Sequence, residues 1–278
     1  MARTDTEAFA LASAFFEDVV TVRDFARDKV RPVVQRFSEE DADDGTVYGL
    51  FLRCMGWLAT LAELKHPQHF QAALAGTRTL LEICIDLALL HHDRANFTPA
   101  KVMAWERSAK LAAAERTRRC FEGRQLPEEH IERVAFIDRN RDAIREERAR
   151  VWPNRERPRS HPARWTGRSL DADAEEADRF GPYGLRDYYD GRFAELCWGT
   201  HGSGLAGVRN IPERDFPGLM AIAFQDASRL GTLACELILR YFDKFDPILQ
   251  QRFRLLEQER LHWNQLAYRK AREASANK

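Results

Sequence analysis

The sequence has little cysteine, little lysine and no excess charge of either sign. Its five cysteines are scattered without a CxxC pair, which favours reduced thiols in a cytoplasmic protein. A formal net charge of zero provides no global attraction to nucleic acid or to a membrane surface. Only seven of the 43 basic residues are lysines. Arginine forms bidentate pairs with carboxylate and phosphate, but a GC-rich coding sequence produces the same bias.

Several common motifs are also absent from the 278 residues. The lack of a P-loop, a dinucleotide glycine motif and a G-x-S-x-G elbow argues against common nucleotide-dependent enzymes and α/β-hydrolases, and we expect no cofactor. The N-terminus lacks the basic and apolar regions of a signal peptide. One apolar stretch approaches the length of a membrane span, but each of its three central charges would cost roughly 2.5–3.5 kcal/mol there.

The hydrophobic pattern is helical, without strand-like alternation. It predicts an all-α fold of about eight to nine helices, forming a single bundle-like domain over residues 1–278. A connector rich in arginine and proline, at about 151–170, is expected to be loosely held. The predicted helices cover residues 6–29, 46–64, 71–90, 99–120, 127–150, 183–198, 218–242 and the residues from 246 onward.

The apolar stretch at 71–90 carries a single polar line. Arg78, Glu82 and Asp86 are spaced at i, i+4 and i+8, which places them on one side of a helix. An arginine within a core needs a hydrogen-bonded partner, and Glu82 lies one turn away. The pair is therefore either an ion pair that fixes helix packing or the wall of a pocket for an anionic ligand.

A glycine-flanked turn, Thr200-His201-Gly202-Ser203-Gly204, follows a predicted aromatic helix. Glycine permits positive φ and close backbone approach, and a protonated histidine is favoured at a helix C-terminus. His201 is thus a candidate general base or anion contact, or simply closes the last turn.

These two stretches carry a resemblance to a known family. Arg78 to Glu82 has the form R-x-x-x-E, and Tyr188-Tyr189 lead to Trp198-Gly199-Thr200-His201-Gly202-Ser203. Over roughly 45–240 the chain resembles the helical bacterial family DUF5677, a domain of unknown function. The resemblance implies a fold and a motif pair without an activity.

The chain has a looser likeness to HEPN-like helical defence and toxin proteins. Those proteins place an arginine and a histidine close together on one helix, with the arginine on phosphate and the histidine on the ribose hydroxyl. Here eight residues separate Arg192 from His201, so an RNase site requires Arg78 or Arg192 to meet His201 in space.

Two further patterns have alternative explanations. His91-His92-Asp93, with His66 and His69 upstream, suggests an HD-like metal-dependent phosphohydrolase or simply a polar helix end. The region 133–168 contains eleven arginines and two tryptophans against five acids. That composition suits single-stranded nucleic acid, or docking onto the acidic run 171–178.

We therefore expect a cytoplasmic stress, phage-defence or toxin-type protein that acts on RNA or a nucleotide, as a possible RNase or phosphohydrolase. In this hypothesis Arg78 neutralises phosphate, His201 handles the proton and Glu82 holds Arg78; no metal is required. Arg192, Ser203 and Asp86 would contact the substrate. The alternative is a non-catalytic binding or scaffold module in which the same residues are structural. A protein partner and a homodimer through amphipathic first and last helices stay open, and no membrane association is expected.

Overall fold

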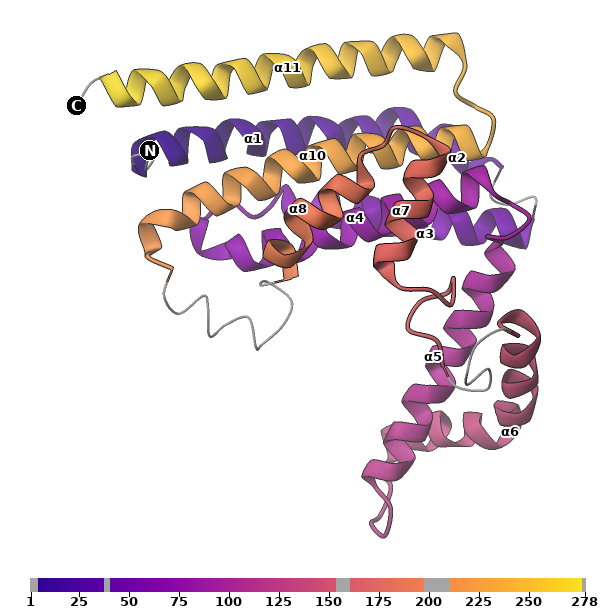
Figure 1. Cartoon of the computed structure of the whole chain (residues 1–278). Helices are drawn as coiled ribbons and strands as arrows, with labels where there is room; N and C mark the ends of the chain where they lie inside the picture. The colour runs from indigo at the N-terminus through magenta and orange to yellow at the C-terminus, as the bar shows by residue number, and fades with distance from the viewer. Residues whose placement is uncertain (1–4, 38–40, 154–160, 198–210, 277–278) are drawn as a thin grey trace. The chain divides into compact units, whose positions relative to one another are not determined.

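The computed structural model describes residues 5–37, 41–153, 161–197 and 211–276 (Figure 1). The regular elements in these ranges are all helical, which confirms the predicted all-α class. None of the helices in the described ranges combines the length and apolar character needed to cross a bilayer. The chain forms two compact units, residues 1–92 with 174–278 and residues 93–173.

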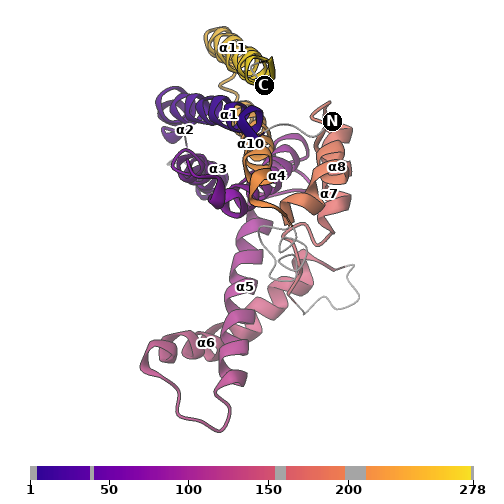
Figure 2. The same cartoon turned by 90° about the vertical axis from the view of Figure 1, so that its left-hand side faces the viewer.

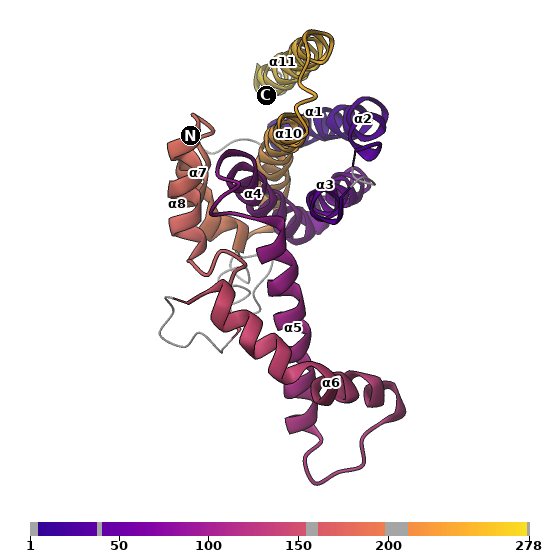
Figure 3. The same cartoon turned by 90° about the vertical axis from the view of Figure 1, so that its right-hand side faces the viewer.

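The larger unit is built around α4 (Phe70–His92) and α10 (Phe216–Tyr241), which pack along each other. Figures 2 and 3 show the unit nearly end-on, with α8 (Leu185–Cys197) and α3 (Ala42–Leu61) on opposite flanks of this pair. Helix α1 (Asp5–Phe25) contacts both α10 and α11 (Pro247–Ala276). The other helical segments of this unit are η1 (Ala26–Val30), α2 (Arg31–Gln35), η2 (Pro67–His69), η4 (Glu213–Asp215) and the part of α7 (Leu170–Phe180) beyond residue 173.

Two glycines allow α4 and α10 to pack closely against α3. A Cβ atom on Gly76 of α4 would lie 2.9 Å from the Trp57 ring of α3. A Cβ on Gly231 of α10 would lie 2.8 Å from a methyl carbon of Leu58. Such distances are shorter than van der Waals contact, so the spacing of these helices depends on glycine having no side chain at both positions.

The polar line of α4 lies along the edge of the core. Arg78, Glu82 and Asp86 are each half-buried, while most other side chains of this helix are buried. The predicted span of 71–90 differs from the observed helix by one and two residues at its ends. The apolar periodicity therefore identified both the helix and its polar side.

The smaller unit is a pair of helices, α5 (Pro99–Cys120) and α6 (Glu128–Val151). Thr98 caps the N-terminus of α5, because its Oγ1 accepts a hydrogen bond from the Lys101 amide at 3.3 Å. Much of α6 is exposed to solvent, in keeping with its mixture of acidic and basic side chains. A small apolar core joins the two helices and contains Leu111, Ala114, Ile137 and Ile144.

The expectation of a loosely held connector is wrong for the part that the structure describes. Trp152 and Trp165 are only 4% and 5% exposed, and Trp152 Nε1 donates to the Trp165 carbonyl oxygen at 2.9 Å. Trp105 Nε1 also donates to the Pro162 carbonyl at 2.9 Å. Burial of the large indoles anchors residues 161–169 despite their lack of helical periodicity.

Candidate functional site

The Arg78–Glu82 pair lies where α8 packs against α4. Arg78 Nε donates to Glu82 Oε1 at 3.0 Å, with the two side chains 20% and 31% exposed. The Arg78 guanidinium also lies over the Phe193 ring of α8, 5.0 Å from its centroid. A part-exposed pair at this spacing contributes only about 0.3–0.5 kcal/mol. Its main effect is to hold the guanidinium in one orientation at a partly accessible position.

A second cluster links α8 to α10. Arg192 Nη1 donates to Glu195 Oε2 at 3.2 Å, and its Nε lies 3.4 Å from Asp226 Oδ2. The Tyr188 hydroxyl donates to Asp226 Oδ1 at 3.2 Å. The Asp226 side chain is only 6% exposed, so Tyr188 supplies a hydrogen bond at Oδ1 and Arg192 supplies a positive charge beside the buried Oδ2.

Burial governs the protonation of this second cluster. Burial raises the pKa of Asp226, and the nearby Arg192 opposes that rise. Burial and then the Asp226 carboxylate raise the pKa of the Tyr188 phenol. Tyr188 therefore remains a hydrogen-bond donor at neutral pH, which suits a positioning role better than a role as general base.

The C-terminus of α8 lies near the first pair. Burial raises the pKa of the Cys197 thiol, while Arg78 lowers it and Glu82 raises it. The last residue of α8 is thus within electrostatic range of both members of the α4 pair. His201 and Ser203 follow Cys197 in the sequence but lie outside the described residues. Asp86 is half-buried one turn beyond Glu82.

A third polar cluster, missed by the sequence reasoning, connects α1, α10 and α11. Ser228 Oγ donates to Asp18 Oδ2 at 2.6 Å, and Arg260 Nε donates to Asp18 Oδ1 at 3.1 Å. Arg260 Nη2 also donates to Ser228 Oγ at 3.1 Å. All three residues are buried. One signal was present in the sequence, since acids such as Asp18 and Asp226 interrupt otherwise apolar helix faces.

The histidines at the end of α4 are engaged with aromatic neighbours. His92 hydrogen-bonds the Tyr183 hydroxyl and stacks on Phe180 with ring centroids 5.5 Å apart. Burial and then Arg240 lower the pKa of His92. Within the described ranges, no three His, Cys, Asp or Glu side chains are placed to hold a metal ion.

The other members of the suggested HD-like motif stabilise local turns. The Asp93 carboxylate accepts hydrogen bonds from the Asn96 amide nitrogen at 3.1 Å and from its side chain at 2.8 Å. His66 Nδ1 accepts from the Gln68 amide at 3.3 Å. His66 therefore caps η2, and Asp93 stabilises the turn that follows α4.

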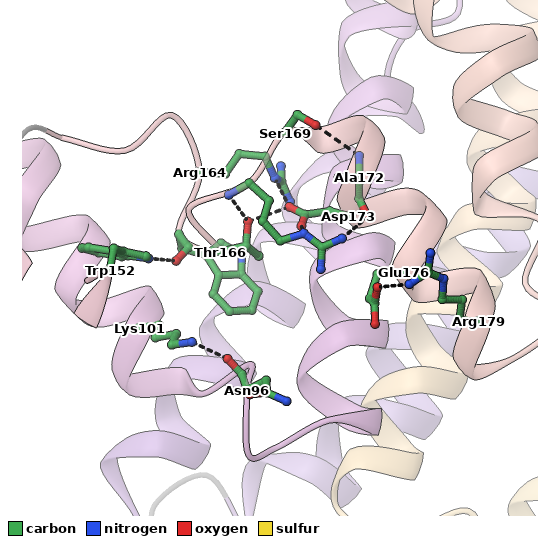
Figure 4. Close-up of polar contacts among 12 residues, drawn as sticks. Asn96, Lys101, Trp152, Arg164, Thr166, Ser169, Ala172, Asp173, Glu176 and Arg179 are labelled. Carbon is green, nitrogen blue, oxygen red and sulfur yellow. Dashed lines mark hydrogen bonds and ion pairs between the residues drawn. The ribbon is translucent and has the colours of Figure 1, made fainter. Parts of the chain in front are cut away.

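The arginine-rich region finds acidic partners within the smaller unit. Figure 4 shows Arg164 and Thr166 converging on Asp173, with donor–acceptor distances of 2.7 and 2.8 Å. Asp173 is fully buried and belongs to the acidic run expected to serve as a partner. Several of the arginines that suggested a nucleic-acid surface therefore have acidic partners in the unit, while Arg155, Arg157 and Arg159 lie outside the described residues. Other arginine pairs there are Arg107–Glu147, Arg118–Asp138, Arg139–Glu132 and Arg145–Glu115.

These helices and clusters define an all-α protein with an arginine–carboxylate site on α4 and α8. The chain belongs to the family of unknown function DUF5677, which matches residues 44–215 and confirms the resemblance. A comparison with curated proteins and another with solved structures found no match. The family range contains Arg78, Glu82 and Arg192, but it ends before Asp226, short of the expected limit near 240.

Proposed function

We propose that this protein binds a phosphate-bearing ligand, RNA or a nucleotide, where the turn bearing His201 meets the Arg78–Glu82 pair. The supporting observation is that the Arg78 guanidinium lies 5.0 Å from the centroid of the Phe193 ring, close to the end of α8 at Cys197. His201 is four residues further along the chain. At roughly 3.3–3.6 Å per residue, the segment spans at most about 14 Å, so the chain is long enough for His201 to reach the pair.

In this proposal each residue has a separate task. The Arg78 guanidinium neutralises phosphate charge, and Glu82 holds it in place through the 3.0 Å contact. His201 takes or gives the proton in a cleavage reaction. Arg192, Ser203 and Asp86 contact the rest of the substrate. The protein would then be a cytoplasmic RNase or phosphohydrolase in stress or phage defence.

The second candidate function is a non-catalytic binding or scaffold module. It is favoured by the ion pairs themselves, since Arg78 and Arg192 already contact Glu82, Glu195 and Asp226. Under this alternative the two clusters fix the packing of α8 against α4 and α10. Replacing Glu82 would then change the unfolding midpoint without changing affinity for RNA.

Binding of a short fluorescently labelled single-stranded RNA, followed by anisotropy, separates the two. Arg78→Gln removes a charge-assisted hydrogen bond to phosphate, worth about 1.5–3 kcal/mol. We expect affinity to fall about tenfold to a hundredfold. The control is Arg179→Gln, because that side chain is 62% exposed and pairs locally on α7. Unchanged affinity in Arg78→Gln, or no RNA binding by the wild type, would contradict the proposal.

Cleavage of the same RNA tests His201 separately. His201→Ala is expected to retain RNA binding and lose cleavage, whereas the exposed His262→Ala retains both. Cleavage that stops on addition of a chelator would instead favour the HD-like phosphohydrolase. Equal cleavage by wild type and His201→Ala would remove the histidine from the mechanism.

A further inference from the structure

A cavity of about 540 Å³ lies in the larger unit, and we call it the Arg229 pocket. Its walls are α10, the turn from Phe180 to Tyr183, Tyr188 of α8 and part of α11. Its volume falls in the range of roughly 300–1,000 Å³ that is usual for small-molecule sites. Neither Arg78 nor Glu82 lines it, so the pocket is a separate feature.

Three arginines give the pocket a positive lining. Arg229 is exposed, and its guanidinium lies over the Tyr188 ring, 5.3 Å from the centroid. Arg260 is 9% exposed and is fixed from behind by Asp18 and Ser228. Buried, hydrogen-bonded arginine is pre-organised to bind an anion, because little side-chain freedom remains to be lost.

The third arginine is paired with an acid, and a second acid also lines the pocket. Arg240 Nη2 lies 2.7 Å from Glu236 Oε1, and both residues line the pocket. Glu257 lines it too, 3.7 Å from Arg260 Nη1 and with its side chain 66% exposed. The charged side chains of the lining are three arginines and two glutamates, and Asp18 pairs with Arg260 from outside the lining. An anionic group in the pocket would be attracted to the exposed guanidinium of Arg229.

Aromatic side chains form the remaining wall. Phe180, Tyr183 and Tyr188 all line the pocket. Phe180 is held by stacking on His92 with an interplanar angle of 14°, and Tyr183 by its hydrogen bond to the same histidine. Rigid aromatic surfaces beside arginines provide contacts for a planar ring and for an anion in one site.

We infer that the Arg229 pocket binds a small anion carrying a planar ring, the chemistry of a mononucleotide. Arg229 and Arg260 contact the phosphate, and the aromatic wall contacts the base. The inference does not rest on the proposed function, because the two sites share no lining arginine. It also does not require RNA binding or cleavage.

Isothermal titration calorimetry of the full chain with AMP, adenosine and inorganic phosphate tests this inference. AMP is expected to bind at least about tenfold more tightly than either fragment, because only AMP reaches both walls. Phosphate that binds as tightly as AMP would overturn the role of the aromatic wall. The absence of AMP binding at millimolar concentration would overturn the inference.

Variants locate the binding. Arg229→Gln is expected to weaken AMP about tenfold, with an unchanged circular dichroism spectrum because the side chain is exposed. Glu257→Gln is expected to tighten AMP, since it removes a nearby negative charge. Arg254→Gln, at an exposed position of α11, is the matched control and should leave AMP binding unchanged. AMP affinity unaffected by both Arg229→Gln and Glu257→Gln would overturn the assignment.

Discussion

Removing the Asp18 carboxylate tests the buried cluster that joins α1, α10 and α11. Asp18→Ala deletes the acceptor for Ser228 Oγ at 2.6 Å and for Arg260 Nε at 3.1 Å. Asp18 is fully buried and Arg260 is 9% exposed, so the guanidinium would be left in the core without its carboxylate. Breaking a buried pair from one side costs about 3–5 kcal/mol. That is a large part of the roughly 5–15 kcal/mol that stabilises a typical protein.

Urea unfolding followed by circular dichroism at the helical band measures this loss. Asp24→Ala is the matched control, since Asp24 is on the same helix but its side chain is 39% exposed and it pairs at the surface with Arg23 and Arg27. Its cost is expected to be about 0–1 kcal/mol. If Asp18→Ala costs no more than Asp24→Ala, the cluster does not hold α11 to the unit.

The pH dependence of the same cluster has a defined sign. Burial raises the folded-state pKa of Asp18 from 3.8, and Arg260 opposes the rise. A raised carboxyl pKa adds stability below the unfolded pKa, and this stability is lost as pH rises through the folded pKa. Wild type should therefore lose stability relative to Asp18→Asn as the pH rises above the unfolded pKa of about 4. A difference that stays constant with pH would refute the reasoning.

Three further outcomes are expected. Gly231→Ala should lower the free energy of unfolding in urea by about 1–3 kcal/mol, because the new Cβ would lie 2.8 Å from a leucine of α3. The control Gly56→Ala places its Cβ in open space and should stabilise the helix by about 0.5–1 kcal/mol. Equal effects would show that the close helix contact is not rigid. Thr98→Ala should cost about 0.5–2 kcal/mol by removing the α5 cap, and a neutral result in thermal unfolding would contradict that role. Burial raises the pKa of Cys54 to about 12. Alkylation of the folded protein at pH 8, followed by mass spectrometry, should therefore label the exposed Cys120 long before Cys54. The reverse order would contradict the burial of Cys54 in the core.

Local features of the fold were predictable from the sequence. The Thr98 cap and the apolar periodicity of α4 depend on residues within one or two turns, and so does the Arg78–Glu82 pair at i, i+4. The order of residues 161–169 was not predictable, because it depends on where the Trp152 indole packs in three dimensions.

Contacts between side chains that lie far apart in the sequence were not predictable either, because they depend on how the helices pack in three dimensions. Arg192 meets Asp226 across two helices, and Arg260 meets Asp18 across 242 positions of sequence. Composition and periodicity identify an acid on an apolar face, but they do not identify its partner. The candidate site could therefore be located on α4 from the sequence, while its α10 contacts required the structure.

The central claim is that His201 lies beside the phosphate group that Arg78 neutralises. NMR of the chain with labelled histidine rings, titrated with inorganic phosphate, measures this directly. We expect the His201 ring resonances to shift in the wild type and to remain fixed in Arg78→Gln, while those of exposed His262 stay unchanged in both. A His201 ring that does not respond in the wild type, or responds equally in Arg78→Gln, would contradict the shared site.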